Sequence, residues 1–258
     1  MAGNVTPTIE STDARRRELA GNLARVRQRI VSACDAAGRP VEEVALIAIT
    51  KTFPASDVVL LAELGVTDVG ENRDQEAAAK LAEVATLYSN AGCADPGVLR
   101  WHFVGALQTN KCASVVGYAS LIHSVDRARL VDALGRAAQH AASLPAAVRC
   151  LVQVDLDEMD RPGRAGARQE DVGAIADAIA AHTHLELAGV MAVAPLAADP
   201  ASAFRRLAAI ADSVRQRHPS ARVISAGMSG DLEQAVANGA THLRVGSALL
   251  GSRRHPVR

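Results

Sequence analysis

The chain has 258 residues, of which 49% are hydrophobic and 22% charged, so its composition is that of a folded globular protein and not of a disordered one. Lys and Arg together number 28, as do Asp and Glu, so the formal net charge is zero and no general attraction to nucleic acid or to an anionic membrane is expected. Aromatic residues make up only 2%, which argues against stacking platforms for single-stranded nucleic acid.

The first ten residues are expected to form a flexible lead, and residues 11–258 a single domain. A long amphipathic helix is expected from Ser11 to Ala37, because apolar side chains recur there at helical spacing and Gly38 and Pro40 follow. Strand-like and helix-like segments then alternate. Strands are expected at residues 44–50, 66–70, 101–104, 121–124, 148–154, 187–191, 222–225 and 242–245. Helices are expected at residues 54–64, 74–87, from near 110, 127–142, up to near 182, 200–217 and 231–238.

Eight strands alternating with helices, at about 25 residues per unit, predict an α/β protein built as a single (β/α)8 TIM barrel with an extra N-terminal helix. An open, doubly wound sheet is the alternative architecture. It is disfavoured because no G-x-G-x-x-G follows the first strand and because such sheets rarely need eight regular units.

The four cysteines indicate a reducing compartment. Cys34, Cys93, Cys112 and Cys150 form no C-x-x-C pair, and no histidine lies at zinc-ligand spacing, so we expect reduced thiols and no metal site. No apolar run reaches the roughly 18 residues of a membrane span, and the first residues lack the apolar core of a signal peptide. The sequence therefore predicts a cytoplasmic protein.

Lys51 is the first candidate for chemistry. In a barrel, functional residues lie at the carboxyl ends of the strands, and Lys51 ends a strongly apolar strand. Poor solvation favours the neutral amine, which can form a Schiff base with an aldehyde. The alternative is a lysine that reaches the rim or pairs with a carboxylate. Lys80, within a helix, and Lys111, at a helix start, are expected to be solvated.

The last two strand ends resemble a phosphate site. Residues 225–230 (SAGMSG) form a Gly-containing turn into a helix, and residues 244–247 (RVGS) add a second Gly turn with a hydroxyl. Backbone N–H groups in such turns attract anions, although ordinary capped turns are the alternative. Asp231 is expected to face away from an anion. Arg244 faces the barrel interior if its neighbours face the helices, and there it needs a ligand atom or an internal carboxylate as its partner.

Other polar residues give a weaker signal. His102, His123 and His242 are expected to be satisfied core histidines. Arg161, Arg164 and Arg168 are expected to lie in a solvated loop. A Schiff-base lysine opposite a phosphate cradle, with an arginine inside the barrel, matches a phosphorylated aldehyde cofactor, of which pyridoxal phosphate (PLP) is the obvious example.

Seven motifs in order show a resemblance to a known family. The chain resembles the single-domain pyridoxal phosphate homeostasis proteins of the alanine racemase N-terminal-barrel type, over roughly residues 12–253. The matching segments are ITK at 49–51, GEN-x-x-QE at 70–76, WHFVGALQTNK at 101–111, IHSVD at 122–126, GVMAV at 189–193, SAGMSGD at 225–231 and RVGSALLGSR at 244–253.

The resemblance implies a role for each matched residue. Lys51 would carry PLP as a Schiff base, and Arg244 would approach the pyridine nitrogen, which makes the ring a weaker electron sink. The ring pocket would be lined by Asn72, Ser124 and Met191. The phosphate cup would be formed by Ser225, Gly227, Met228, Ser229, Gly246 and Ser247.

The chain also departs from the family pattern at four positions. Ser247 replaces a usual Thr and keeps the hydroxyl, Asp155 replaces a usual Asn, and Arg164 stands near a usual Lys. Arg73 stands where a Tyr is common, so any stacking or hydroxyl contribution of that Tyr is lost.

Three functions are compatible with these residues. The first is a non-catalytic PLP carrier that buffers the cofactor in the cell and hands it to apoenzymes. The second is an amino-acid racemase, which needs a second base. In the racemases a Tyr supplied with the help of a C-terminal β-domain is that base, whereas this chain is expected to lack the domain and its tyrosines, Tyr88 and Tyr118, fall at helix ends. The third is a Schiff-base aldolase acting on a sugar phosphate. Without the β-domain a monomer is expected.

Overall fold

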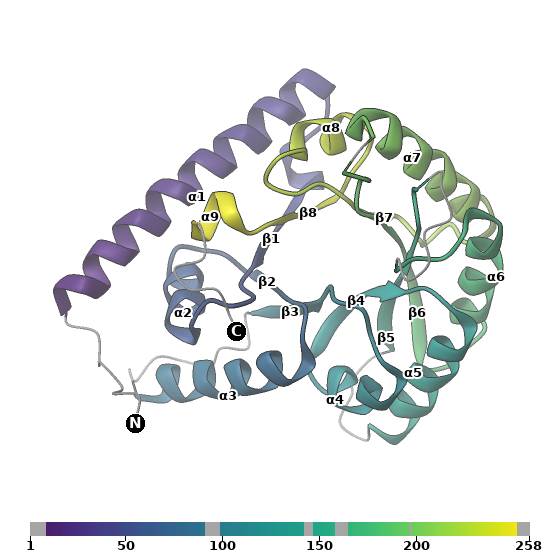
Figure 1. Ribbon diagram of the computed structural model, residues 1–258, viewed down its shortest axis with the longest axis horizontal. Helices are drawn as coiled ribbons and strands as arrows, with labels where there is room; N and C mark the ends of the chain where they lie inside the picture. The colour runs from purple at the N-terminus through teal and green to yellow at the C-terminus, as the bar shows by residue number, and fades with distance from the viewer. Residues whose placement is uncertain (1–8, 91–98, 142–146, 158–164, 197, 252–258) are drawn as a thin grey trace.

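The computed structural model describes residues 9–90, 99–141, 147–157, 165–196 and 198–251. Its centre is a closed barrel of eight parallel strands in chain order, in which β1 also pairs with β8 (Figure 1). The strands are β1 (Ala45–Ile49), β2 (Asp68–Glu71), β3 (Arg100–Phe103), β4 (Ala119–Val125), β5 (Val148–Gln153), β6 (Leu185–Met191), β7 (Val223–Ser225) and β8 (His242–Val245). The predicted (β/α)8 fold is confirmed.

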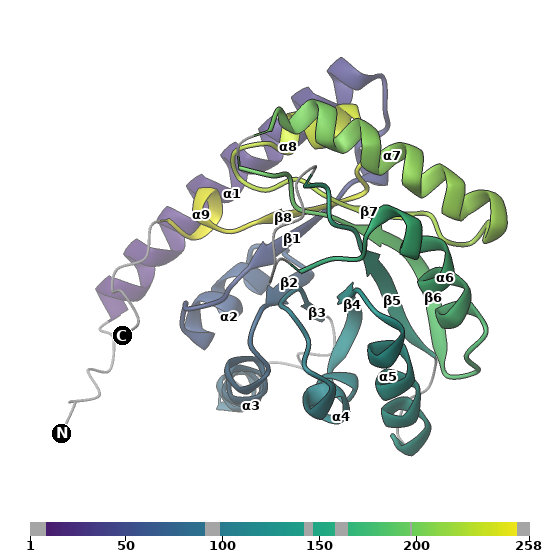
Figure 2. The ribbon, with the colours of Figure 1, turned by 45° about the vertical axis from the view of Figure 1, so that its right-hand side comes forward.

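Helices surround the barrel on its outside (Figures 1 and 2). They are α1 (Ile9–Ala37), α2 (Ala55–Glu63), α3 (Asp74–Asn90), α4 (Cys112–Val116), α5 (Ala128–His140), α6 (Gln169–Ala180), α7 (Pro200–Arg217), α8 (Leu232–Ala237) and α9 (Ser247–Leu250), with short 3-10 turns at Val41–Glu43 and Thr109–Lys111. The long helix α1 packs across α8 and α9, and so covers the barrel where its first and last strands meet.

The core has two layers because strand side chains alternate between the two faces of the barrel wall. The outer layer lies between strands and helices and contains Leu19, Leu61, Val69, Ile122 and Leu243, all of them buried. A small apolar cluster of Leu121, Leu151, Ala188, Met191 and Val223 fills part of the interior. Polar side chains, described below, occupy other interior positions where such barrels usually place branched apolar residues.

Most predicted boundaries differ from the observed ones by one to three residues. The helix expected from Ser11 begins at Ile9, because the helical backbone extends into what was predicted as the lead. The sequence pattern missed α9, which has only four residues and too little periodicity to detect. Residues 1–8 of the predicted lead, Cys93, and Arg161 and Arg164 of the predicted loop lie outside the described residues.

The membrane prediction can be checked on the helices that the structure describes, and none of them combines the length and apolar character needed to cross a bilayer. Cys34, Cys112 and Cys150 are buried free thiols. Burial raises the pKa of Cys112 to about 11 and that of Cys150 to about 12, so both remain protonated thiols. These cysteines therefore serve as small apolar core residues.

Candidate functional site

A cavity of about 560 Å³ opens at the carboxyl ends of the barrel strands. Residues that follow β1, β2, β3, β6, β7 and β8 line it, so segments far apart in the chain meet there. Its lining consists of Ile49, Lys51, Thr52, Phe53, Asn72, Val104, Gly105, Met191, Val193, Met228, Ser229, Gly230, Arg244, Gly246, Ser247 and Gly251. This is the end of a (β/α)8 barrel at which ligands bind.

Lys51 enters this cavity directly after β1. It is half-buried, and among the described residues its amine makes no hydrogen bond or ion pair. The next residue, Thr52, has a φ of 68°, a left-handed conformation that is strained for a β-branched side chain. The chain therefore turns sharply after Lys51, and it leaves a lysine amine available to a ligand.

A buried ion pair supports the backbone behind Lys51. Lys80 Nζ lies 2.5 Å from Glu71 Oε1 and 2.7 Å from the carbonyl oxygen of Thr50. The Thr50 hydroxyl donates to the same Glu71 oxygen at 2.7 Å. The side chains of Lys80 and Glu71 are 8% and 0% exposed, so the prediction of a solvated Lys80 is wrong.

The helix α3 gives the physical reason for this error. Ala77, Lys80 and Val84 are all buried and lie three and four residues apart, so Lys80 belongs to the apolar stripe that faces the barrel. That stripe covers the end of β2, where Glu71 supplies the opposite charge. Lys111 is closer to its prediction, since its side chain is 34% exposed and lies 3.9 Å from Asp74.

The loops after β2 and β3 pack against each other very closely. A Cβ atom added to Gly105 would lie 2.0 Å from the carbonyl oxygen of Asn72, so only glycine fits there. Both residues line the cavity. The contact fixes the backbone of Asn72 at the edge of the cavity, where the sequence predicted a ring-binding residue.

The turn after β7 is held by Asp231. Its Oδ1 accepts a hydrogen bond of 2.6 Å from the backbone N–H of Met228, while Gly227 adopts a positive φ of 89°. The carboxylate is thereby used within the turn, as expected for a residue that must not face an anion. The hydroxyl of Ser229 accepts from the N–H of Ala248 at 3.1 Å, which ties this turn to the one after β8.

Several backbone donors in these turns have no acceptor. Within the part of the chain that the structure describes, they include the N–H groups of Gly230 and Ser247, and both residues line the cavity. Free backbone N–H groups in Gly-containing turns of this kind can bind an anion.

Arg244 lies on β8 and points into the barrel, as its strand position predicted. It is 5% exposed and donates from Nη1 to Ser225 Oγ at 2.6 Å and from Nη2 to the carbonyl oxygen of Ala192 at 2.8 Å. Burial lowers the pKa of its guanidinium to about 10, and the charge of Asp231 opposes this shift. Arg244 therefore remains a cation and a hydrogen-bond donor at neutral pH.

The structure brings most of the predicted site residues into one cavity. Those that line it are Lys51, Asn72, Met191, Met228, Ser229, Arg244, Gly246 and Ser247. Ser124, Ser225 and Gly227 do not line it. Ser225 lies behind Arg244, and Ser124 is buried with a hydroxyl that has no hydrogen-bond partner. The sequence analysis did not single out Thr52, Phe53, Val104, Gly105 or Val193, although all of them follow strand ends.

The position that departs most from the family pattern lies outside this cavity. The side chain of Arg73 is 62% exposed and its Nη1 lies 2.9 Å from Glu76 Oε1. Arg73 is therefore a surface residue directly before α3, and it does not line the cavity. His102 and His123 are buried and hydrogen-bonded, in agreement with the prediction that they are satisfied core histidines.

The residues present fit a phosphorylated aldehyde. An amine without a partner, free backbone N–H groups and a buried guanidinium converge on one cavity. Phosphate oxygens need N–H donors, an aldehyde needs an amine, and a ring nitrogen needs one donor or acceptor. Each of these requirements has a counterpart in the lining.

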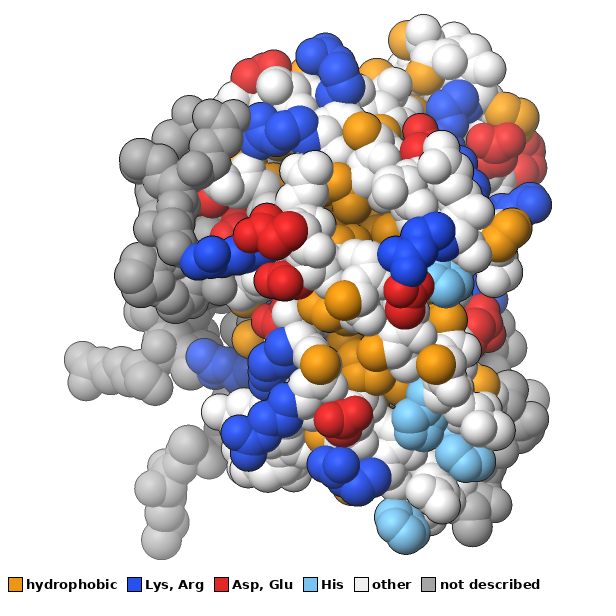
Figure 3. All heavy atoms as spheres, turned by 90° about the vertical axis from the view of Figure 1, so that its right-hand side faces the viewer, with side chains coloured by type: hydrophobic (Ala, Val, Ile, Leu, Met, Phe, Trp, Pro, Cys, Tyr) orange, Lys and Arg blue, Asp and Glu red, His pale blue; other side chains and the backbone are white. Residues whose placement is uncertain are grey.

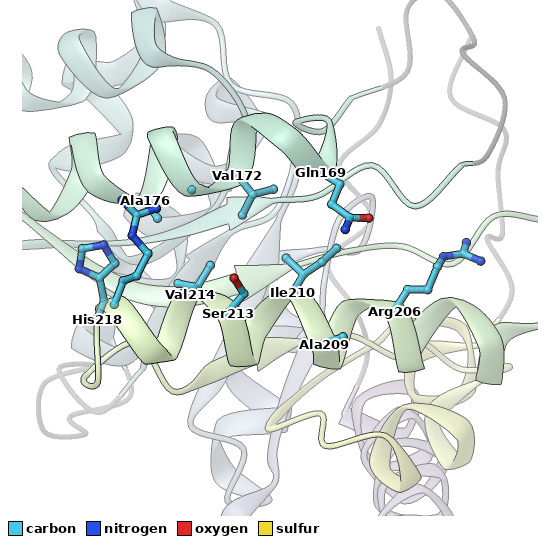
Figure 4. Close-up of a pocket in the computed structure, with 11 residues that line it drawn as sticks. Gln169, Val172, Ala176, Arg206, Ala209, Ile210, Ser213, Val214 and His218 are labelled. Atoms are coloured by element: carbon cyan, nitrogen blue, oxygen red, sulfur yellow. The ribbon is translucent and has the colours of Figure 1, made fainter.

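A second hollow lies on the outside of the molecule, between α6 and α7 (Figure 4). It has a volume of about 340 Å³ and contains apolar side chains such as Val172, Ile210 and Val214. Two of its lining residues, Arg217 and His218, contact Asp177, the latter at 2.8 Å. On this side of the molecule positive and negative side chains are interspersed (Figure 3). The hollow is a groove between helices, and it lacks the converging free donors of the Lys51 cavity.

The comparisons with known proteins first define the class. The family described as "Alanine racemase, N-terminal domain" matches residues 21–254. An alanine racemase from Corynebacterium glutamicum shares the fold with a TM-score of 0.58 at 17% identity, over 91% of this chain and 60% of that chain. The chain is thus a barrel of the alanine racemase N-terminal type.

More similar relatives then identify the family. The pyridoxal phosphate homeostasis protein of Mycobacterium tuberculosis is 45% identical over 249 residues, which are 93% of this chain and 95% of that protein. The Escherichia coli protein of the same name is 33% identical, over 92% of this chain and 97% of that protein. PipY of Synechococcus elongatus, solved with PLP bound, has a TM-score of 0.74 at 32% identity, over 90% of this chain and all of that chain. The chain belongs to the pyridoxal phosphate homeostasis protein family.

Proposed function

We propose that this protein binds PLP in the Lys51 cavity, with Lys51 Nζ joined to the PLP aldehyde as a Schiff base, and that it acts in intracellular PLP homeostasis as a non-catalytic carrier. The observation that carries the proposal is the lysine amine without a partner, opposite free backbone donors in one cavity. The family name of the relatives and the PLP-bound PipY structure support it.

Each group in the cavity has a task in this proposal. The N–H groups of Gly230 and Ser247, with the hydroxyl of Ser247, hold the phosphate. Met191 and Asn72 contact the ring. PLP supplies a reactive aldehyde and, in enzymes, an electron sink for carbanions. Arg244 donates a hydrogen bond to the ring nitrogen and keeps it unprotonated, which weakens that electron sink and suits a holding function.

The absence of a second base favours a carrier over a racemase. Among the described residues that line the cavity, only Lys51 and Arg244 carry titratable side chains. Racemisation needs a second proton donor or acceptor on the opposite face of the substrate. Tyr118 does not line the cavity, and burial raises the pKa of its hydroxyl well above the usual range. Tyr88 does not line the cavity either.

Reduction with borohydride tests the Schiff base. Purified protein and the variants Lys51→Ala and Lys111→Ala are mixed with PLP, reduced and digested for mass spectrometry. We expect visible absorbance that reduction abolishes, and a pyridoxyl group on Lys51, in the wild type and in Lys111→Ala but not in Lys51→Ala. Absence of the band in the wild type after PLP addition, or modification of a different lysine alone, would refute the proposed linkage.

Hydrogen exchange separates the carrier from the racemase. The PLP-loaded protein is incubated with single enantiomers of alanine and other amino acids in D2O. A carrier leaves the Cα hydrogen and the configuration unchanged. Deuterium at Cα together with inversion, lost in Lys51→Ala, would establish the racemase instead.

The cellular role requires PLP to leave the cavity. We infer that the protein is a cytoplasmic monomer that buffers PLP and passes it to apoenzymes. Reactivation of an apo PLP enzyme is measured with free PLP and with the loaded protein. Direct transfer predicts a rate that rises with loaded protein beyond the limit set by spontaneous PLP dissociation, whereas buffering alone predicts that limit. Sedimentation velocity measures the oligomeric state.

A further inference from the structure

A chain of buried polar side chains crosses the barrel interior behind the cavity. Ser225 Oγ accepts from Arg244 Nη1 at 2.6 Å and lies 2.9 Å from His123 Nδ1. His123 Nε2 lies 3.0 Å from His102 Nδ1, and His102 Nε2 lies 2.9 Å from Asp68 Oδ1. All five residues are at most 5% exposed. We call these residues the interior relay.

The carboxylate end gives the interior relay one arrangement in which two neutral imidazoles satisfy every group. Asp68 can only accept, so His102 donates to it from Nε2 and accepts at Nδ1. His123 then donates from Nε2 to His102 and accepts at Nδ1, where the Ser225 hydroxyl donates to it. The Ser225 oxygen still accepts from Arg244, because a guanidinium only donates. In this arrangement both imidazoles are Nε2–H tautomers.

The far end of the relay is anchored at the start of β2. Arg100 donates to Asp68 from Nε at 2.8 Å and from Nη2 at 2.6 Å. Hydrogen bonds from His102 and Arg100 hold the pKa of Asp68 far below its usual range, against the opposing effect of burial, so Asp68 is a permanent acceptor. At the other end, the second bond of Arg244, to Ala192, limits rotation of the guanidinium. The relay is therefore fully ordered by a carboxylate at one end and a cation at the other.

We propose that the interior relay is a positioning device for the ligand's ring nitrogen: Asp68, His102, His123 and Ser225 fix the orientation of Arg244 and keep it a donor. This proposal rests on the proposed PLP function. None of the four residues lines the cavity, so they act through Arg244 and are positioning residues. Positioning Arg244 would explain why polar side chains stand at these interior positions of the barrel.

The relay can accept an extra proton only by reorganising. A proton on His102 would make it donate from Nδ1, so His123 would have to shift its hydrogen to Nδ1 and the Ser225 hydroxyl would lose its acceptor. Protonation of His123 itself is also opposed: burial lowers its pKa, and the neighbouring groups His102, Arg244, His242 and Arg149 lower it further. Around His102 lie Asp68, His123 and, with its ring centroid 6.4 Å away, His242.

Imidazole ¹⁵N NMR on the ligand-free protein tests the assignment without PLP. Long-range ¹H–¹⁵N spectra distinguish the two neutral tautomers from the imidazolium, and single-histidine variants assign the signals. We expect His102 and His123 to be neutral with hydrogen on Nε2 at pH 7. An imidazolium at His102, or hydrogen on Nδ1 of His123, overturns the relay direction. This experiment needs no destabilised variant.

The bound cofactor then reports the positioning effect. His123→Phe removes the middle of the relay, and His242→Phe is the matched control, since the His242 ring also lies beside His102 while its Nδ1 hydrogen-bonds to Thr241 and not to a relay residue. We expect His123→Phe to raise the PLP dissociation rate by about 3- to 30-fold, as positioning changes remote from a ligand do. We also expect it to shift the ¹⁵N signal of the PLP ring nitrogen, with the control near wild type.

The outcomes separate this proposal from the proposed function. If Lys51 is not modified by PLP in the wild type, the proposed function fails, while the tautomer assignment is still tested on the free protein. If Lys51 is modified but His123→Phe leaves both the dissociation rate and the ring-nitrogen signal unchanged, or if His242→Phe changes them equally, the positioning role is wrong. Should His123→Phe fail to fold, Ser225→Ala replaces it, because it interrupts the relay next to Arg244 with a smaller change in volume.

Discussion

The buried pair of Lys80 and Glu71 allows a quantitative test of how the site is supported. Replacing Lys80 by Met removes the cation and leaves a fully buried carboxylate without its partner. Glu71 Oε2 already has no hydrogen-bond partner, so few other groups would stabilise the buried negative charge once Lys80 is removed. Breaking a buried ion pair by removing one member costs about 3–5 kcal/mol of unfolding free energy.

The same reasoning predicts how a second substitution restores stability. Glu71→Gln in the Lys80→Met background removes the uncompensated charge and keeps an acceptor for the Thr50 hydroxyl. We expect the double variant to be more stable than Lys80→Met by at least about 1.5 kcal/mol, a coupling in the range found for residues in contact. The control Lys111→Met removes a half-exposed lysine and is expected to cost less than about 1 kcal/mol.

Urea unfolding at pH 7, followed by circular dichroism, measures these differences. For a chain of this size, 3–5 kcal/mol corresponds to a fall in Tm of about 6–20 °C. Lys80→Met is also expected to weaken PLP binding, because Lys80 holds the carbonyl oxygen of the residue before Lys51. A loss below about 1 kcal/mol in Lys80→Met, or a double variant no more stable than the single one, would refute the buried-pair argument.

Three further predictions concern other parts of the molecule. Gly105→Ala forces a Cβ against the carbonyl oxygen of Asn72, so it is expected to lower the unfolding free energy by about 1–3 kcal/mol and to weaken PLP binding. The control Gly21→Ala lies in a helix with room for a methyl group. In the same urea assay it is expected to raise the unfolding free energy by up to about 1 kcal/mol. Burial lowers the pKa of His242 to about 4, so the folded state binds fewer protons than the unfolded state between pH 4 and 6.5, and the unfolding free energy should fall by about 3 kcal/mol as pH drops through that window. His242→Gln should flatten this pH dependence, and an unchanged slope would contradict the assignment. Arg73→Tyr should change the PLP dissociation constant less than about threefold by fluorescence titration, since Arg73 is exposed and lies outside the cavity, and a larger gain would show that the family's Tyr reaches the ligand.

Much of the fold could be predicted because the barrel repeats one local pattern. Each strand is a short apolar run, and each helix has its own period, so the order of the elements followed from the sequence. The inward direction of Arg244 followed from alternation along β8, since Leu243 and Val245 pack outside. The location of the cavity could then be predicted at the strand ends, because parallel strands in a barrel place their carboxyl ends on one side.

The features that could not be predicted depend on contacts between segments far apart in the chain, and a local sequence pattern carries no information about such contacts. The place of Lys80 in the apolar stripe of α3 was visible, but its partner Glu71 belongs to a different element. Ser225 was predicted in the phosphate cup, while its hydroxyl bonds to His123, 102 residues earlier in the chain. Only the closed barrel brings these strands within hydrogen-bonding distance.

The features that cost stability are concentrated near the proposed site. Thr52 has a strained backbone, Glu71 and Lys80 are desolvated, and Arg244 is a buried cation whose nearest partners are neutral oxygens. Elsewhere in the interior, Leu121, Leu151 and Val223 form an ordinary apolar cluster. Sequences that fold well violate local rules mainly where function requires it. The concentration of these costs around Lys51 and Arg244 is therefore an argument for the site that does not depend on any relative, and it accounts for a polar interior that packing alone would not select.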